Sequence, residues 1–423
     1  MADRFNRSYL ICISGPWSVP FTYPMLAMTE WILADGYRYS GVVSGLRNEP
    51  DRRDLALIVS DRPAAGAGVF TQNRVCAAPV HVCRERLPSD QVRGIVICSG
   101  NANACTGDQG MKDARRMAEI VAGQLKCEPS QILVCSTGVI GRMLPMEILE
   151  RGIPLAATKL TADKTGLNDA AHAILTTDSH IKVFTRTVAT SAGEIRLTGF
   201  AKGAAMIGPN MATMLGFILT DAAVKPGDLH YLLKSAVEQS FNCISVEGHT
   251  STNDTVLLLA NGTGAPLEGH DLSAFTGAVN GLCAELARSI AADAEGANHL
   301  VVIDIEGCRS DAEAKQIAKT IAESPLVKTA IYGGDPNWGR FVSAAGYSGV
   351  MFDDKDLTLW MGDMLLFRAG MPLPFDAAAA SNYLKRHREV HLRLRFTLGP
   401  GRCTYYTCDL TPEYVRLNAD YTT

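Results

Sequence analysis

The stretch GFAKGAAMIGPNMATML (Gly199 to Leu215) lies near the middle of the 423-residue chain and leads into a short apolar run. The run Met214 to Leu219 carries no charge, which is typical of a buried strand. Glycine and alanine make up seven of its 17 residues, and Lys202 is its one cation. A turn of small residues at the start of a buried strand predicts a loop at a sheet edge, where backbone amides and hydroxyls can face a ligand.

Buried strands and amphipathic helices are mixed along the whole chain. Besides Met214 to Leu219, apolar runs bounded by turn residues predict strands at Leu55 to Val59, Gly94 to Cys98, Ile132 to Cys135, Ile181 to Phe184, Thr255 to Ala260 and Leu300 to Ile305. Helical periodicity marks Met111 to Leu125, Asp228 to Gln239, Leu272 to Asp293 and Ser310 to Glu323. Val390 to Phe396 alternates polar with apolar residues, as a strand with one wet face does. We expect a single α/β (mixed α+β) unit of two intimately packed lobes.

The charge balance excludes some classes of partner. Forty basic and 44 acidic side chains give a formal net charge of −4, and no long run of Lys and Arg occurs. Nucleic acids and anionic membranes both call for a clustered positive surface that offsets their phosphates. With 47% hydrophobic and 20% charged residues, the composition is that of a globular protein. We therefore expect no nucleic acid and no membrane as a partner.

The first 36 residues differ from the rest. Residues 8–29 carry no charge and follow two arginines, a pattern also found in signal peptides and membrane anchors. Three prolines interrupt the stretch, and each internal proline costs a helix about 3 kcal/mol. We expect either an irregular arm over residues 1–36 or a start codon placed upstream of Met25 or Met28, with the folded body beginning near Tyr37.

Familiar metal and catalytic motifs are absent. The 12 cysteines are scattered, and no pair has the spacing of a zinc knuckle or a dithiol redox site, so we expect reduced thiols in a cytoplasmic protein, without disulfides or a metal. The chain has no HExxH, Walker A, GxGxxG or GxSxG sequence. His387 and His391 have i, i+4 spacing, but their basic surroundings predict a solvated face. A histidine-assisted hydrolase therefore has little local support.

Five turns rich in glycine, asparagine and threonine are the unusual feature. Each alone is consistent with a tight turn, but five in one chain predict several loops that converge on a polar pocket for a small ligand. The five are SGNANACTG (Ser99 to Gly107), CSTGVIG (Cys135 to Gly141), GFAKGAAMIGPNMATML (Gly199 to Leu215), EGHTSTNDT (Glu247 to Thr255) and YGGDPNWGR (Tyr332 to Arg340).

These motifs and a terminal NADYTT, in this order, resemble the ornithine acetyltransferase family, the glutamate N-acetyltransferases of the cyclic arginine pathway. The resemblance runs from about Gly41 to Thr423, roughly nine-tenths of the chain. It implies a fold shared with self-cleaving aminopeptidases, in which sheets are layered between helices. Six separated motifs are a far stronger signal than one glycine pattern.

Members of that family are made as one precursor that cuts itself before the threonine of the ATML motif, here the Ala212–Thr213 bond. The resemblance implies an alpha chain of residues 37–212 behind the arm and a beta chain of residues 213–423, which form one catalytic unit and assemble as two of each chain. Thr213 would be an N-terminal nucleophile. Its own amine, with a pKa of about 7.7–8.0, can act as the base without a histidine.

The implied reaction is a ping-pong transfer of acetyl from N2-acetylornithine to glutamate, which gives ornithine and N-acetylglutamate. Thr213 attacks the acetyl carbonyl, and its amine returns a proton to the leaving ornithine. In the family the Thr-Gly of the STGVIG turn supplies the oxyanion donors, here the Thr137 hydroxyl and the Gly138 N–H, and loss of one such donor costs about 10²–10³ in rate. No cofactor is implied. No motif identifies a coenzyme A site, so acetyl-CoA as a second donor stays open.

The family's substrate contacts carry over to separate parts of the chain. A cation at Lys202 suits an α-carboxylate, and a carboxylate at Glu295 suits an ammonium group, so the pair fits an amino-acid substrate. In the TTD motif, Thr176 matches the family ligand, but Thr177 remains an alternative. The complete set of implied substrate contacts is Thr176, Lys202, Thr213, Glu295, Asn418 and Thr423.

Two departures from the family pattern leave other functions open. The family usually has an acidic residue before TSTND, where this chain has His249, and the N-terminal arm is longer than usual. A paralogue that acts on another N-acyl amino acid is one alternative. A hydrolase of the related aminopeptidase fold, with water as acceptor, is another. A non-catalytic binding protein is the third, and intact Thr213, Thr137 and Lys202 count against it.

Overall fold

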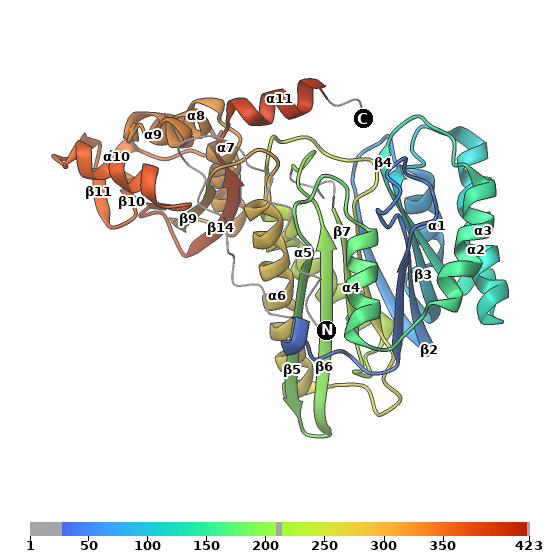
Figure 1. The fold of residues 1–423 in the computed structure, drawn as a ribbon. Coiled ribbons are helices and arrows are strands. Elements are labelled where there is room, and N and C mark those ends of the chain that lie inside the picture. The colour runs from blue at the N-terminus through green and yellow to red at the C-terminus, as the bar shows by residue number, and fades with distance from the viewer. Residues whose placement is uncertain (1–27, 209–213, 421–423) are drawn as a thin grey trace, which may run out of the picture.

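The computed structural model describes residues 28–208 and 214–420 as two lobes, each built on one sheet (Figure 1). The larger lobe has an eight-stranded sheet of order β4-β3-β2-β8-β7-β6-β5, with β1 paired to β2. Its strands are β1 Tyr37–Val42, β2 Leu55–Phe70, β3 Ser89–Asn101, β4 Ile132–Val139, β5 Lys182–Thr190, β6 Gly193–Lys202, β7 Leu215–Thr220 and β8 Thr255–Ala260.

The centre of this sheet is buried, as its continuous apolar sequences predict. Every residue of β7 and of β8 is buried, and the two strands run parallel. Strands buried on both faces lose the polar alternation of an exposed sheet. The predicted strand at Thr255 to Ala260 has the observed bounds of β8, and the strand predicted from Met214 begins one residue later.

Helices cover both faces of the larger sheet. Leu257 and Leu259 of β8 pack in the core that α4 (Lys164–Ala173) covers, whereas Val256 and Leu258 face the core of α5 and α6. This alternation follows from the two-residue period of a strand. In Figure 1, α4 overlies one face of the sheet, and α2 and α3 lie at the right of the view, on the side of β2 and β3. The remaining helices of this lobe are α1 Ala78–Arg86, α2 Gly107–Leu125, α3 Met146–Thr158, α5 Pro226–Glu238 and α6 Gly269–Ala292, with 3₁₀ turns at Pro129–Gln131 and Phe241–Cys243.

The smaller lobe has a six-stranded sheet of order β12-β11-β10-β13-β9-β14. Strand β13 alternates buried with exposed residues, which confirms the predicted wet face. The Ser310 side chain caps α7 by accepting a hydrogen bond from the Glu313 N–H, at the start of the helix predicted from Ser310. The elements are β9 Leu300–Cys308, α7 Asp311–Ala322, α8 Pro325–Gly333, α9 Trp338–Gly346, 3₁₀ Asp354–Asp356, β10 Thr358–Met361, β11 Met364–Arg368, β12 Met371–Pro372, α10 Ala377–Arg386, β13 Glu389–Arg395, β14 Gly401–Cys408 and α11 Pro412–Asp420.

One hydrophobic cluster spans the two lobes. Leu300 and Val302 of β9 and Cys408 of β14 pack in the same cluster as α5 and α6 of the larger lobe. In Figure 1, α11 runs from the smaller lobe towards the larger one. The predicted mixed α/β fold of two intimately packed lobes is therefore confirmed.

Residues 28–36, the described end of the predicted arm, contain one 3₁₀ turn at Met28–Glu30 and no other regular element. This segment is packed against the sheet. Trp31 is 4% exposed and Ala34 is 3% exposed, and the Ala34 N–H donates to Thr198 Oγ1 at 2.8 Å. The uncharged stretch before Met28 lies outside the described residues. Within the described ranges, no helix has the length and apolarity that a membrane crossing needs.

Candidate functional site

A cavity of about 410 Å³ lies where loops from both sides of the predicted cut meet. This volume suits a small molecule. Residues before the cut line one part of the wall and residues after it line the other. The structure brings together six of the predicted site residues here, Thr137, Gly138, Thr176, Lys202, Glu295 and Asn418.

The Thr-Gly turn at the end of β4 is fixed by its contact with β3. The two strands are parallel, and Gly138 is the register partner of Gly100. Gly138 has a φ of +130°, and a Cβ on it would lie 2.3 Å from the carbonyl carbon of Gly100. Only glycine fits such a conformation at such an approach. Thr137, 3% exposed, lines the cavity beside it.

Two asparagines that were not among the predicted site residues donate hydrogen bonds to the loops around this turn. Asn101 Nδ2 donates to the carbonyls of Arg142 and Met143, at 3.2 and 3.1 Å. Asn253 Nδ2 donates to the carbonyls of Ala102 and Ser136, at 2.6 and 2.9 Å. Both asparagines lie within predicted glycine-rich and threonine-rich loops. Their side-chain amides donate to backbone carbonyls of neighbouring segments, as buried polar groups require.

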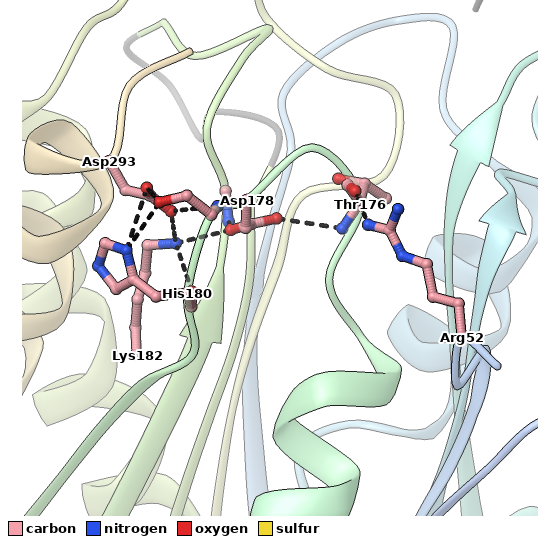
Figure 2. A network of polar contacts seen from close by, with 8 residues as sticks. Arg52, Thr176, Asp178, His180, Lys182 and Asp293 are labelled. Carbon is pink, nitrogen blue, oxygen red and sulfur yellow. Dashed lines mark hydrogen bonds and ion pairs between the residues drawn. The ribbon is translucent and has the colours of Figure 1, made fainter. Parts of the chain in front are cut away.

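The Thr176 turn is held by two arginines and an aspartate. Arg47 Nη2 donates to the Leu175 carbonyl at 2.6 Å, and Arg52 donates to the Thr176 carbonyl (Figure 2). The Thr176 N–H donates to Asp178 Oδ2 at 3.1 Å. Thr176 is half-buried and Thr177 is exposed, and both line the cavity. Both threonines are therefore candidate substrate contacts.

A network of buried charged side chains lies beside this turn (Figure 2). Lys182 Nζ donates to Asp178 Oδ1 at 2.7 Å and to Asp293 Oδ2 at 2.6 Å, and its side chain is fully buried. Asp293 also accepts from Ser179 and lies 3.2 Å from His180 Nδ1. Burial alone would raise the pKa of Asp178, but Lys182 and Lys202 hold it well below its ordinary value. The network joins the Thr176 turn to the end of α6, so it ties the two sides of the predicted cut together.

Lys202 ends β6 at the cavity wall and is 1% exposed. Burial lowers the pKa of its ammonium group to about 8, although Asp178 counteracts that effect. The neighbouring Gly203 N–H donates to Asp178 Oδ1 at 2.6 Å, which fixes the backbone beside it. Below about pH 8 the cavity therefore holds a positive charge with little water around it, and a substrate carboxylate would gain more from such a charge than from a surface lysine.

Glu295 and Asn418 also line the cavity and contact each other. Asn418, on α11, donates through Nδ2 to Glu295 Oε2 at 3.3 Å and to the Tyr414 carbonyl at 2.9 Å. The Glu295 N–H donates to the Ala204 carbonyl at 2.9 Å, which ties it to the loop after Lys202. Burial raises the pKa of the Glu295 carboxyl. The C-terminal helix thus contributes a wall of the cavity.

Ala212, Thr213 and Thr423 lie outside the described residues. Met214, which follows Thr213 in the chain, is described, and its N–H donates to Asp254 Oδ1 at 3.1 Å. Asp254 is fully buried, and burial raises the pKa of its carboxyl well above the ordinary value. Met214 therefore lies beside the TSTND loop, whose Ser251, Thr252 and Asn253 line the cavity.

The prediction that several of these loops converge on one pocket is confirmed for four of them, but the fifth loop does not reach this cavity. YGGDPNWGR lies between α8 and α9 in the smaller lobe, and none of its residues lines the cavity. Gly334 ends α8 with a φ of +66°, and a Cβ on it would lie 2.7 Å from Lys385 Cε. The same residue types that build a ligand loop also end a helix. His249 is exposed and is not a lining residue either.

The arrangement suits acyl transfer from an amino-acid derivative. One cavity is lined by the Thr137–Gly138 turn, the buried cation Lys202 and the carboxylate of Glu295. Hydrogen-bond donors of this kind stabilise an oxyanion, and the two charges match the termini of an amino acid. Among the described residues, no cluster of three or more His, Cys, Asp or Glu side chains could hold a metal ion.

Comparison with known proteins gives a consistent result. The family model described as ArgJ matches residues 38–423. The arginine biosynthesis bifunctional protein ArgJ of Rhodopirellula baltica is 42% identical over 400 residues, which cover 93% of this chain and 97% of that protein. ArgJ 1 of Nostoc sp. is 45% identical over 404 residues, which cover 92% of this chain and 96% of that one. Among solved structures, the ornithine acetyltransferase of Mycobacterium tuberculosis complexed with ornithine is 37% identical, with a TM-score of 0.39, over 42% of this chain and 92% of that one.

Proposed function

The chain belongs to the ArgJ family, and on that premise we propose that it moves acetyl from N2-acetylornithine to glutamate through an acyl-enzyme on Thr213. Its relatives carry the name arginine biosynthesis bifunctional protein, so the chain is a transferase of arginine biosynthesis. The resemblance of the motifs is thereby confirmed at the level of the family. The chemical steps that follow are our proposal.

One observation carries the proposal. A single cavity gathers the Thr137–Gly138 turn, Lys202 and Glu295, which lie far apart in the sequence. Lys202 would bind the α-carboxylate, and Glu295 would bind the side-chain ammonium of N-acetylornithine. The two charges therefore orient the acetyl group of that substrate relative to the turn, because they fix both ends of one extended amino acid.

In the first half-reaction, the Thr213 hydroxyl attacks the acetyl carbonyl and gives its proton to its own α-amine. The Thr137 hydroxyl and the Gly138 N–H stabilise the oxyanion of the tetrahedral intermediate. The C–N bond then breaks, and the α-amine returns the proton to the ornithine nitrogen. In the second half-reaction, the amine of glutamate attacks the ester, the C–O bond to Thr213 breaks and the hydroxyl is restored.

We propose that Thr213 becomes N-terminal by self-cleavage at Ala212–Thr213, which gives an alpha chain of residues 37–212 and a beta chain of residues 213–423. Two chains of each kind would form the assembly. The cysteines of the described residues are free thiols, which supports a reducing, cytoplasmic location. Side chains and the terminal amine suffice for the proposed steps, so no cofactor is needed.

Mass spectrometry of the denatured protein tests these steps together. The protein should give two chains, and incubation with N-acetylornithine should add about 42 Da to the beta chain, the mass of one acetyl group in place of hydrogen. Addition of glutamate should remove that mass and release N-acetylglutamate. A single uncut chain, or acetyl on the alpha chain, would contradict the mechanism.

The same assay separates the alternatives. Loss of the acetyl group to water at a rate that glutamate does not change would indicate a hydrolase. Acetylation by another N-acyl amino acid in preference to N-acetylornithine would indicate a paralogue with a different substrate. Acetylation of the beta chain by acetyl-CoA would add a second donor to the proposed reaction.

A further inference from the structure

Asn253 is buried between the two sides of the predicted cut. It is 5% exposed, and its amide nitrogen donates to the carbonyls of Ala102 at 2.6 Å and Ser136 at 2.9 Å. Its amide oxygen accepts from Thr252 Oγ1 at 2.5 Å. Because both targets of the nitrogen are carbonyl oxygens, these contacts fix the orientation of the amide group.

The Ser136 carbonyl belongs to the peptide group that leads into Thr137. Asn253 therefore holds the start of the turn, while the approach of Gly138 to Gly100 holds its end. A turn fixed at both ends presents the Thr137 hydroxyl and the Gly138 N–H in one orientation. Oxyanion donors depend on such preorganisation, because reorientation during the reaction would cost part of the stabilisation.

We infer that Asn253 is a positioning residue for the oxyanion turn, an inference that rests on the proposed function. Asn253 acts through Ser136 and Ala102 and not by contact with the reacting atoms. The next residue strengthens the argument, because Asp254 Oδ1 accepts from the Met214 N–H at 3.1 Å. Two consecutive residues of the TSTND loop thus fix the oxyanion turn and the residue after the proposed nucleophile relative to each other.

The chain supplies a matched control at the other end of the same strand. Asn261 follows β8 as Asn253 precedes it, and it is 1% exposed. Its Nδ2 donates to the carbonyls of Asp35 and Gly36, at 3.1 and 3.0 Å. Both asparagines thus join a residue after the predicted cut to two carbonyls before it. A purely structural role predicts the same outcome for both, whereas positioning predicts a loss of turnover only for Asn253.

The experiment compares Asn253→Asp, Asn253→Ala, Asn261→Asp and Asn261→Ala in the full chain. Acetyl transfer from N-acetylornithine to glutamate is measured per cleaved enzyme, with the cleaved fraction taken from intact mass and the fold monitored by thermal denaturation. We expect the Asn253 variants to lower kcat about 10²-fold, as a displacement of about 1 Å can do, with a smaller change in KM. The Asn261 variants should lower Tm and leave kcat close to that of the wild type.

Asn253→Asp also has a pH signature. The ionised carboxylate has no hydrogen to donate and repels both carbonyls, whereas the protonated acid regains one O–H donor. The ratio of its kcat to that of the wild type should therefore rise as the pH falls from about 8 to about 6, since burial raises the pKa of a carboxyl. This readout uses folded, cleaved protein and remains valid where Asn253→Ala fails to fold.

The outcomes separate two failures. Equal losses of kcat in the Asn253 and Asn261 variants, or a flat pH ratio, would overturn the positioning role while the wild type still transfers acetyl. A wild-type protein that transfers no acetyl to glutamate would instead overturn the proposed function itself.

Discussion

Lys202 and Leu215 are register partners across the antiparallel strands β6 and β7. Strand β6 therefore ends and β7 begins at the same end of the sheet, and the predicted cut at Ala212–Thr213 falls in the connection between the two strands. Backbone hydrogen bonds join β6 to β7 over their whole paired length. A cut in the connection would break the chain without opening the sheet, because the bonds between the strands do not depend on the loop.

Thr213→Ala should remain one uncut chain and should lose acetyl transfer by at least about 10³-fold, because one hydroxyl serves both reactions. The conservative change Thr213→Ser keeps a hydroxyl and should still cut. Denaturing and native mass spectrometry provide the measurement. The wild type should show two chains when denatured and one assembly when native, given the pairing of β6 with β7. A cut in Thr213→Ala, or a cut at another bond, would remove Thr213 as the nucleophile.

Gly138→Ala should lower kcat by about 10²–10³, the cost of a lost oxyanion donor. The added Cβ would lie 2.3 Å from the Gly100 carbonyl carbon and 2.6 Å from the Asn101 nitrogen, so the turn has to move. Gly141→Ala is the matched control, because Gly141 also has a positive φ, of +79°, but has open space at the Cβ position. Steady-state kinetics of both variants provide the check. Equal kcat values in the two variants would mean that the turn has no part in turnover.

The pH profile of kcat/KM should fall above about pH 8, where the buried Lys202 loses its charge. The sign follows from the lowered pKa, since the ammonium is positive below it and neutral above it. Lys202→Arg keeps a positive charge at all these pH values and should move the falling limb to higher pH. Lys202→Met should raise the KM for N-acetylornithine far more than removal of an exposed lysine such as Lys159. If the fall of kcat/KM stays at the same pH in Lys202→Arg, a group other than Lys202 causes it.

Asp178→Asn should destabilise the fold by about 3 kcal/mol or more, because it removes one of the two carboxylates that compensate the buried Lys182. Urea denaturation measures this change. Asp61→Asn is the control, since the Asp61 ion pair with Arg38 is solvent-exposed and such pairs contribute about 0–1 kcal/mol. The negative charge of Asp178 raises the pKa of Lys202. Asp178→Asn should therefore also move the fall of the kcat/KM profile to lower pH. Equal stabilities of the two variants would refute the role of the network.

The sequence predicted elements best where burial imposes one pattern on every residue. Thr255 to Ala260 was located to the residue because β8 is buried along its whole length. The strand predicted at Leu55 to Val59 continues to Phe70, and the extension was missed because residues 61–63 are polar or proline and partly exposed. β2 crosses from one set of partners to another there, with a shift of register, and only the neighbours of a strand fix such a change.

The site was predictable where a motif carries its own chemistry. Thr137, Gly138, Lys202 and Glu295 line one cavity, and the roles that the resemblance implies for them stay predictions. Asp178, Lys182 and Asn253 were not singled out, since each has a partner in another segment, respectively the Gly203 N–H, the Asp293 carboxylate and the Ser136 carbonyl. The YGGDPNWGR turn was one of five candidate loops and does not line the pocket, and the sequence could not separate it from the other four, because a glycine that ends a helix and a glycine that faces a ligand look the same in sequence.

The sequence alone determined the family, the order of the motifs and the bond where the chain is expected to break, because these depend on residue identity. The tertiary structure decided how the parts combine. The lobes do not coincide with the two sides of the predicted cut, since β7 and β8 follow it and yet lie between β2 and β6 in the larger sheet. The physical reason is that strand pairing and burial act between segments far apart in the chain, so a cavity lined by Lys202 and Asn418 exists only once the whole chain has folded.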